Sequence, residues 1–307
     1  MFAFLIHVCI YFMIYATLAV SCNLIIGYGG MQQIGHGGFF AIGAYVAAIL
    51  STRTHVPFLV ELAFAGLLAG AVGGILCLSV VSASTDYFAL ATFAFGSVTF
   101  TVSTMWYPVT NGLLGISNIP PIRLFGLEIA RGLPFLLLSA VLLGITLLVS
   151  VRLVHSPFGR VLKGTRDDEA GVVATGRSAV WIKTVTYSVS VFFAGLAGAV
   201  FAHYSTFVDP TGFTTDVSFF VMALVIVGGL GTIWGPIVGS AILVILPELF
   251  RFIGLPSTYA GLLRQVLYGG MLILVLLLRP KGLVGGTGIG VKRVKAGGSG
   301  LAPRSES

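Results

Sequence analysis

The composition of this chain excludes an ordinary soluble protein. Of its 307 residues 57% are hydrophobic and only 9% are charged, and the mean hydropathy is +1.03, whereas a globular chain carries roughly 25% charged residues. Its 17 Lys and Arg outnumber its 10 Asp and Glu, and in so apolar a chain this excess is expected on cytoplasmic loops of a membrane protein, not at a nucleic-acid surface.

Nine apolar segments follow one another along the chain, and each is predicted to be a helix because backbone polar groups in hydrocarbon must be satisfied internally. We therefore expect an all-α polytopic membrane protein with about eight to ten transmembrane helices, some short or broken by Gly-rich segments. Residues 1–280 are expected to form one transmembrane domain. The segments are Phe2–Ile26, Ile34–Leu50, Phe58–Val81, Tyr87–Trp106, Leu133–Val151, Thr184–Phe207, Val217–Leu230, Ile233–Ile253 and Gly261–Leu278.

Two of these segments, Ile34–Leu50 and Val217–Leu230, are short and adjoin glycine runs at residues 27–30 and 228–231. Short, interrupted segments in transporters can line the transport path. Other glycines, such as Gly66, Gly70 and Gly74 at a spacing of four, instead predict faces where helices pack closely.

The orientation follows from two clusters of basic residues. Residues 152–183 hold six Lys and Arg and residues 281–307 hold five more, so both regions are expected in the cytoplasm. The second region is rich in Gly, Ser and Lys and is predicted to be a flexible tail. Counting back from the first region places the N-terminus outside if Ile34–Leu50 crosses the membrane, and inside if that segment only dips into it.

Catalytic motifs are missing from the sequence. Lys163, Gly164 and Thr165 do not have the order that a nucleotide-binding loop needs, and no nucleophile, base or metal cluster occurs at usable spacing. We therefore expect no enzyme activity, no cofactor and no ATP hydrolysis on this chain. Charged residues near segment ends, Glu61 among them, are expected to reach water. The scarcity of charge within segments disfavours a proton- or sodium-driven carrier, so energy is expected to enter through a partner.

Residues 152–183, the central loop, carry the most informative pattern. Asp167 and Asp168 are predicted to cap a short helix that Gly176 ends roughly two turns later. A short helix on a cytoplasmic loop can dock into a groove of another protein. A solvated surface helix without a partner is the alternative.

The central loop resembles the ATPase-contacting loop of the M-type permease subunits of bacterial high-affinity branched-chain amino acid importers. The glycine at 176 comes one residue later than in many importers, and Asn111 stands where the family has a glycine. The matching loop residues are Ser156, Phe158, Gly159, Arg160, Arg166, Glu169 and Gly176, and further matches lie at 27–30, 35–36, 39–45, 194–199, 228–236 and 278–283.

This resemblance implies the permease of an ATP-binding-cassette (ABC) importer in the bacterial inner membrane, surrounded by lipid. Its partners would be a second homologous permease, two ATPase subunits and a periplasmic or extracellular solute-binding protein. Branched-chain amino acids are the expected solute; urea or short amides, or a passive channel or carrier, are the alternatives. The residues expected to couple to the ATPases are Arg160, Arg166, Asp167, Asp168, Glu169, Ala170 and Gly176.

A path for zwitterionic amino acids should be weakly polar, because strong binding would slow release. Five polar residues in or near apolar segments are the candidates for lining it. They are Gln32, Gln33, His36, Ser97 and Thr101.

Overall fold

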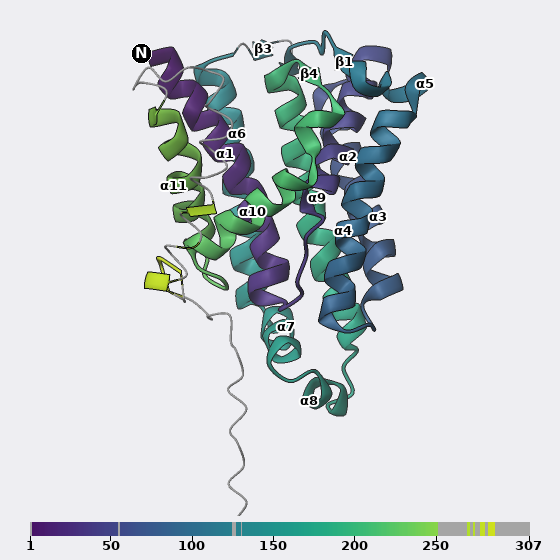
Figure 1. The fold of residues 1–307 in the computed structure, drawn as a ribbon, viewed down its shortest axis with the longest axis vertical. Coiled ribbons are helices and arrows are strands. Elements are labelled where there is room, and N and C mark those ends of the chain that lie inside the picture. The colour runs from purple at the N-terminus through teal and green to yellow at the C-terminus, as the bar shows by residue number, and fades with distance from the viewer. Residues whose placement is uncertain are drawn as a thin grey trace, which may run out of the picture.

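The computed structural model describes residues 2–54, 56–124, 127–129 and 131–250, together with the short pieces 269–270, 273, 277–279 and 282–285. The described chain is an upright bundle of helices with connections at its two ends (Figure 1). Its strands form two short two-stranded sheets, so the all-α class is confirmed. The predicted segment Gly261–Leu278 and the tail 281–307 lie almost entirely outside the described residues.

Six described helices are long and apolar enough to cross a membrane. The predicted number of eight to ten is not reached within the described part of the chain, where α2 (His36–Ile49) and α11 (Gly235–Phe250) are shorter. The six spans are α1 (Phe2–Asn23) with the π-helical turn η1 (Leu24–Tyr28), α3 (Phe58–Val80), α4 (Thr85–Met105), α6 (Leu133–His155), α9 (Ala179–Ser205), and α10 (Thr215–Gly228) with the preceding 3₁₀ turn η4 (Pro210–Phe213).

Helix α2 continues without a break into the π-helical turn η2 (Leu50–Thr54). The 14 residues of α2 and the 5 residues of η2 together extend about 28 Å at roughly 1.5 Å per residue, close to the ~30 Å of a bilayer core. Residues 30–35 precede α2 in non-helical form and rise from the end of η1 into the middle of the bundle (Figure 1). The extended stretch, α2 and η2 together complete the crossing, and the N-terminus consequently lies at the end of the bundle opposite α7 (Pro157–Asp167) and α8 (Glu169–Ala174).

Helix α9 is the most buried of the six spans and packs chiefly on α2 and α3. Glycines permit this close approach, because a Cβ at Gly43 of α2 would collide with the backbone of Gly195. On α3, Gly66 and Gly74 lie directly against side chains of α9. The close packing predicted for the spaced glycines of α3 is therefore confirmed, since a larger residue there would push the helices apart.

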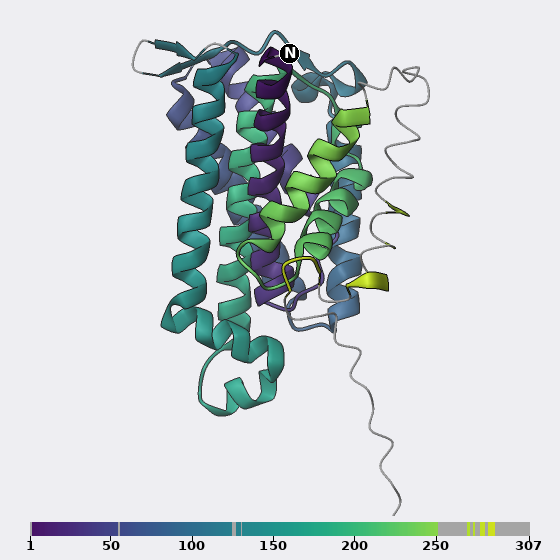
Figure 2. The same ribbon diagram turned by 90° about the vertical axis from the view of Figure 1, so that its left-hand side faces the viewer.

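The end of the bundle that holds the N-terminus is covered by short elements (Figure 2). Strand β1 (Ile116–Ser117) pairs antiparallel with β4 (Phe207–Val208), and β2 (Ile122–Leu124) pairs with β3 (Leu127–Ile129). Strands β1, β2 and β3 lie in the α4–α6 connection, after α5 (Tyr107–Thr110) and the turn η3 (Gly112–Leu114). Because β4 follows α9, the β1–β4 pair joins this connection to the end of α9.

Asn111, where the resemblance led us to expect a glycine, lies between α5 and η3 with φ 59°. That left-handed conformation favours glycine, and asparagine is among the residues that tolerate it best. The Asn111 side chain also donates to the carbonyl oxygen of Gly115 at 3.2 Å. The loop therefore keeps a glycine-like backbone at this position despite the replacement.

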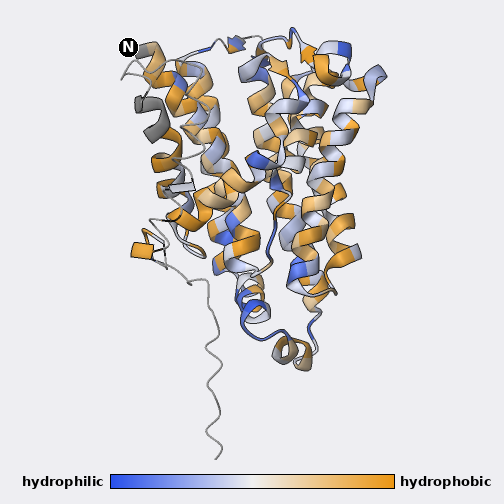
Figure 3. Ribbon diagram, in the orientation of Figure 1, coloured by the Kyte–Doolittle hydropathy of each residue, from blue (hydrophilic) through white to orange (hydrophobic). Residues whose placement is uncertain are grey.

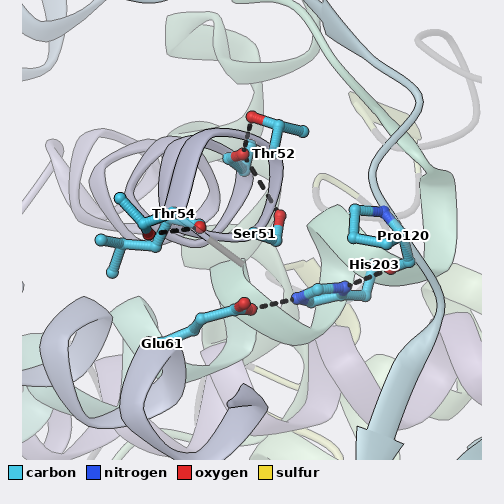
Figure 4. A network of polar contacts seen from close by, with 8 residues as sticks. Ser51, Thr52, Thr54, Glu61, Pro120 and His203 are labelled. Carbon is cyan, nitrogen blue, oxygen red and sulfur yellow. Dashed lines mark hydrogen bonds and ion pairs between the residues drawn. The ribbon is translucent and has the colours of Figure 1, made fainter. Parts of the chain in front are cut away.

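Glu61 does not reach water as expected. Its side chain on the first turn of α3 is only 4% exposed, and its Oε2 lies 2.7 Å from Nε2 of His203 on α9. The other ring nitrogen of His203 lies 3.0 Å from the carbonyl oxygen of Pro120, between β1 and β2 (Figure 4). The expectation was wrong because nearness to a helix end does not expose a residue when a neighbouring segment covers that end.

Candidate functional site

The central loop forms two short helices, α7 and α8, which project from the end of the bundle away from the N-terminus (Figures 1 and 2). The Oγ of Ser156 accepts from the backbone N–H of Gly159 and caps α7. Asp168 caps α8 by accepting from the N–H of Gly171 at 3.1 Å. Gly176, with φ +79°, follows the end of α8. The predicted short helix, its cap by Asp168 and its glycine stop are confirmed, whereas Asp167 is the last residue of α7 and not a cap of α8.

Helix α8 is held away from the bundle. None of its six residues is buried, and its Val173 is 55% exposed. Trp181, in the first turn of α9, is 65% exposed. The predicted coupling residues Arg160, Asp167 and Ala170 are exposed as well. The arrangement offers another protein a small helix with both charged and apolar side chains.

Arg166 ties α7 to the first glycine run, residues 27–30. Its Nη1 donates to the carbonyl oxygen of Gly27 at 2.9 Å, and its Nε donates to Asp167 at 2.9 Å. Its aliphatic stem covers Gly30, where a Cβ would collide with it. Lys163, one turn earlier, lies 5.6 Å from the ring centre of Tyr28, within reach of a cation–π interaction. The central loop is thus attached where the helix η1 gives way to the extended segment.

The second glycine run, residues 228–231, lies at the same end of the bundle and is joined to the first through Asn23. The Oδ1 of Asn23 accepts from the N–H of Gly231 at 3.0 Å, and its Nδ2 donates to the carbonyl oxygen of Thr232 at 2.8 Å. Our sequence reasoning missed Asn23, although an amide within the apolar run Phe2–Ile26 was a usable signal, since amides bond across helices in membranes. Both glycine runs and α7 therefore form one connected unit.

Glu169, the first residue of α8, is paired with Lys183 of α9. The Lys183 Nζ donates to Oε2 of Glu169 at 2.6 Å, and the exposed fractions of the two side chains are 13% and 49%. Lys183 entered the sequence reasoning only as one cation of the central loop. Because the two residues lie 14 positions apart on different helices, their spacing did not indicate the pair.

The extended segment brings two predicted path residues into the interior. Gln33 and His36 are each 1% exposed. Within the described part of the chain, both amide atoms of Gln33 and the Nδ1 of His36 have no hydrogen-bond partner. The Nε2 of His36 lies 2.9 Å from Oγ of Ser21. Figure 3 shows this hydrophilic stretch among apolar helices. Unsatisfied buried groups are costly. These polar atoms can therefore form hydrogen bonds that the described fold does not supply.

The backbone of this segment and of the first turn of α2 is held by side chains of α4 and α10. The N–H of Ile34 donates to Thr92 at 3.1 Å, and the N–H of Gly37 donates to Ser218 at 2.9 Å. Non-helical backbone at membrane depth needs such partners. These two hydroxyls were not among the predicted site residues.

The remaining predicted path residues lie elsewhere. Gln32 is exposed, Ser97 is half-buried and Thr101 is exposed. The hydroxyls of Ser97 and Thr101 donate to carbonyl oxygens of α4 itself, at 3.2 and 2.9 Å. The extended segment packs instead against Thr92 of the same helix. The structure therefore brings Gln33 and His36 together but not Ser97 and Thr101.

Comparison with known proteins decides the family. Residues 4–276 match the family described as the permease component of the branched-chain amino acid transport system. The chain belongs to this permease family. It is 35% identical over 295 residues to LivM of Escherichia coli, a high-affinity branched-chain amino acid transport system permease protein, covering 89% of this chain and 68% of that relative.

More distant members of the permease family extend the comparison over nearly their full length. A probable branched-chain amino acid transport permease of Methanocaldococcus jannaschii is 25% identical to this chain, and the matched region covers 90% of this chain and 91% of that relative. The permease BraD of Pseudomonas aeruginosa is 24% identical, covering 88% and 91%. No solved structure matches the chain significantly. Family membership and the six apolar helices identify a multi-pass transport permease.

Proposed function

We propose that this chain is the transmembrane permease subunit of an ABC importer that moves branched-chain amino acids into the cytoplasm. The names of its relatives support this solute. In the proposal, ATP is hydrolysed on two partner ATPase subunits, a second homologous permease completes the path, and a solute-binding protein delivers the amino acid from outside. The central loop and the tail 281–307 lie in the cytoplasm, and the N-terminus lies outside.

The contact between Arg166 and Gly27 carries the coupling proposal. The residues that would meet the ATPases are Arg160, Arg166, Asp167, Asp168, Glu169, Ala170 and Gly176. A push on the projecting α8 passes to α7, because the two helices are separated by Asp168 alone, and from α7 through Arg166 to the glycine run. That run leads directly into the segment that holds Gln33 and His36. The permease then switches between its two states when the connected unit of α7 and the glycine runs changes from one arrangement to another.

The unpartnered polar atoms of Gln33 and His36 support a solute path along the extended segment. An amide offers a donor and an acceptor, which suits the carboxylate and the ammonium group of an amino acid. The proposed path continues over Gln32, Ser97 and Thr101. Helix α4 is the least buried of the six spans, so a second permease subunit covering its face would enclose the last two residues.

Uptake of labelled leucine by membrane vesicles that contain the assembled importer tests the proposal. Arg166→Glu replaces the attraction to the Gly27 carbonyl by repulsion, and it should abolish uptake and ATPase co-purification while membrane insertion stays normal. Arg123→Glu is the matched control, because Arg123 is exposed at the opposite end of the bundle. Normal uptake by the Arg166 variant would exclude the coupling role.

Two further measurements separate the alternatives. Leucine uptake by the purified chain alone in liposomes, without ATP, would show a passive channel or carrier. Uptake of labelled urea or acetamide, but not leucine, by the assembled importer would assign the other solute class. The proposal predicts ATP-dependent uptake of leucine and no uptake of urea or acetamide.

A further inference from the structure

A cavity of about 170 Å³ lies between the central loop and the end of the bundle. Its walls come from the first glycine run, the α3–α4 turn, the junction of α7 and α8, and the first turns of α9. Pockets for drug-sized ligands measure roughly 300–1,000 Å³, so this cavity admits one small solute and excludes a nucleotide.

The charged side chains of the cavity have both signs. Arg166 and Lys183 line it with cations and Glu169 lines it with a carboxylate. Lys183 and Glu169 are paired at 2.6 Å, but Glu169 is about half exposed, and such pairs cost little to open. A ligand with one carboxylate and one ammonium group could replace this single ion pair by two.

Part of the lining is apolar. Met31, Val81 and Phe88 line the cavity there, and each is at most 6% exposed. An inorganic anion would match the two cations but would also face Glu169, and it would gain nothing from the apolar part of the lining. A small zwitterion with an aliphatic side chain uses all three kinds of surface.

We propose that this cavity is a second binding site for the amino acid, filled from the cytoplasm after transport. The carboxylate lies toward Lys183 and Arg166, the ammonium group toward Glu169, and the side chain toward Met31 and Phe88. This site rests on the proposed function for its solute and orientation. Because Glu169 begins α8 and Arg166 holds Gly27, an occupant connects the central loop to the bundle. Accumulated product therefore restrains α8 and slows further import.

Binding of tritiated leucine to the purified full-length chain in nanodiscs tests the site. Unlabelled leucine should compete, whereas 4-methylpentanoate, 3-methylbutylamine and inorganic phosphate should each compete at least tenfold more weakly, because each lacks one of the two charges. Equal competition by phosphate would show an anion site and overturn the proposal, as would the absence of leucine binding.

Variants then locate the binding. Ala83→Phe places a ring at the cavity wall and should weaken leucine binding at least tenfold, while Ser82→Phe in the same exposed turn, outside the lining, should leave it unchanged. Lys183→Met, which keeps the aliphatic stem, should give a similar loss and serves as a second variant if Ala83→Phe folds poorly. Loss of binding in Gln33→Leu, but not in either cavity variant, would place the ligand in the extended segment and overturn the proposal.

Import measurements distinguish this inference from the proposed function. Vesicles of the assembled importer, with and without leucine loaded inside, are compared for initial uptake. For the wild type, initial uptake into loaded vesicles should be at least threefold slower than uptake into empty vesicles. For Ala83→Phe, the ratio of the two uptake rates should be close to one. No uptake from empty vesicles contradicts the proposed function itself, whereas uptake that internal leucine never slows contradicts the inference alone.

Discussion

The guanidinium group of Arg166 donates from Nη1 to the carbonyl oxygen of Gly27 across 139 positions of the chain. This bond joins the last turn of α7 to the π-helical turn η1, and the side chain is only 20% exposed. A π-helical turn leaves backbone groups outside the regular α-helical pattern. The central loop therefore contacts the bundle at an irregular stretch of backbone, next to the non-helical residues 30–35.

Arg166→Met should uncouple the importer without unfolding the chain. Methionine keeps an unbranched apolar stem over Gly30 but loses the bond to Gly27, and a hydrogen bond to a charged group contributes about 1.5–3 kcal/mol. We expect ATP-dependent leucine uptake to fall at least tenfold with normal insertion. Uptake in vesicles measures this. Arg177→Met, an exposed cation beyond α8, is the control, and equal uptake in both variants would contradict the prediction.

Gly30→Ala should destabilise the same contact from the other side. Gly30 has φ +68°, and a Cβ there would collide with the stem of Arg166. The left-handed backbone alone costs an L-residue about 1–2 kcal/mol. The thermal unfolding midpoint in detergent should fall. In a chain that already carries Arg166→Ala, the same substitution should lower the midpoint less, because the collision is relieved while the backbone strain remains. Gly144→Ala, whose Cβ would meet nothing within 4 Å, should leave the midpoint unchanged or raised; an equal fall in both would show that the contact is not the cause.

Asn23→Leu should loosen the junction of the two glycine runs. The substitution leaves the N–H of Gly231 and the carbonyl oxygen of Thr232 without the bonds that Asn23 gives them, at about 1–3 kcal/mol for each stranded group. We expect a lower unfolding midpoint and reduced uptake. Thr17→Val is the matched control, because its buried hydroxyl donates to the carbonyl oxygen of Met13 on its own helix and makes no bond to the glycine runs among the described residues. A larger effect at Thr17 than at Asn23 would exclude the junction as a structural element.

Hydropathy predicted most of the helices because burial in lipid requires long apolar runs. Its count of eight to ten spans is not confirmed within the described part of the chain, where six helices have the length and hydropathy of a span. The run Ile34–Leu50 is extended at its start and helical after it, a change that hydropathy does not detect. Asp168 and Gly176 were predictable as helix stops because capping is local. The bonds from Arg166 to Gly27 and from Asn23 to Thr232 were not, because they join distant positions that no spacing rule relates.

The burial of Glu61 likewise depends on a contact between distant positions, with His203 of α9, that no spacing rule indicates. Since the carbonyl oxygen of Pro120 can only accept, Nδ1 of His203 carries a proton, and one further proton lies between Nε2 and Glu61. Glu61→Gln preserves a donor toward Nε2 and should change the unfolding midpoint little. His203→Leu strands a buried carboxyl group and should cost about 3–5 kcal/mol, as breaking buried pairs does.

The double variant Glu61→Leu/His203→Leu separates the polar pair from simple packing. Replacing both partners by apolar residues of similar size is often neutral, so the double variant should be more stable than His203→Leu alone. Unfolding midpoints in one detergent, measured for the wild type and the variants, check this order. If the two single Leu substitutions instead sum to the effect of the double, the pair is not coupled, and the stability of this end comes from packing of Phe58 against the imidazole ring.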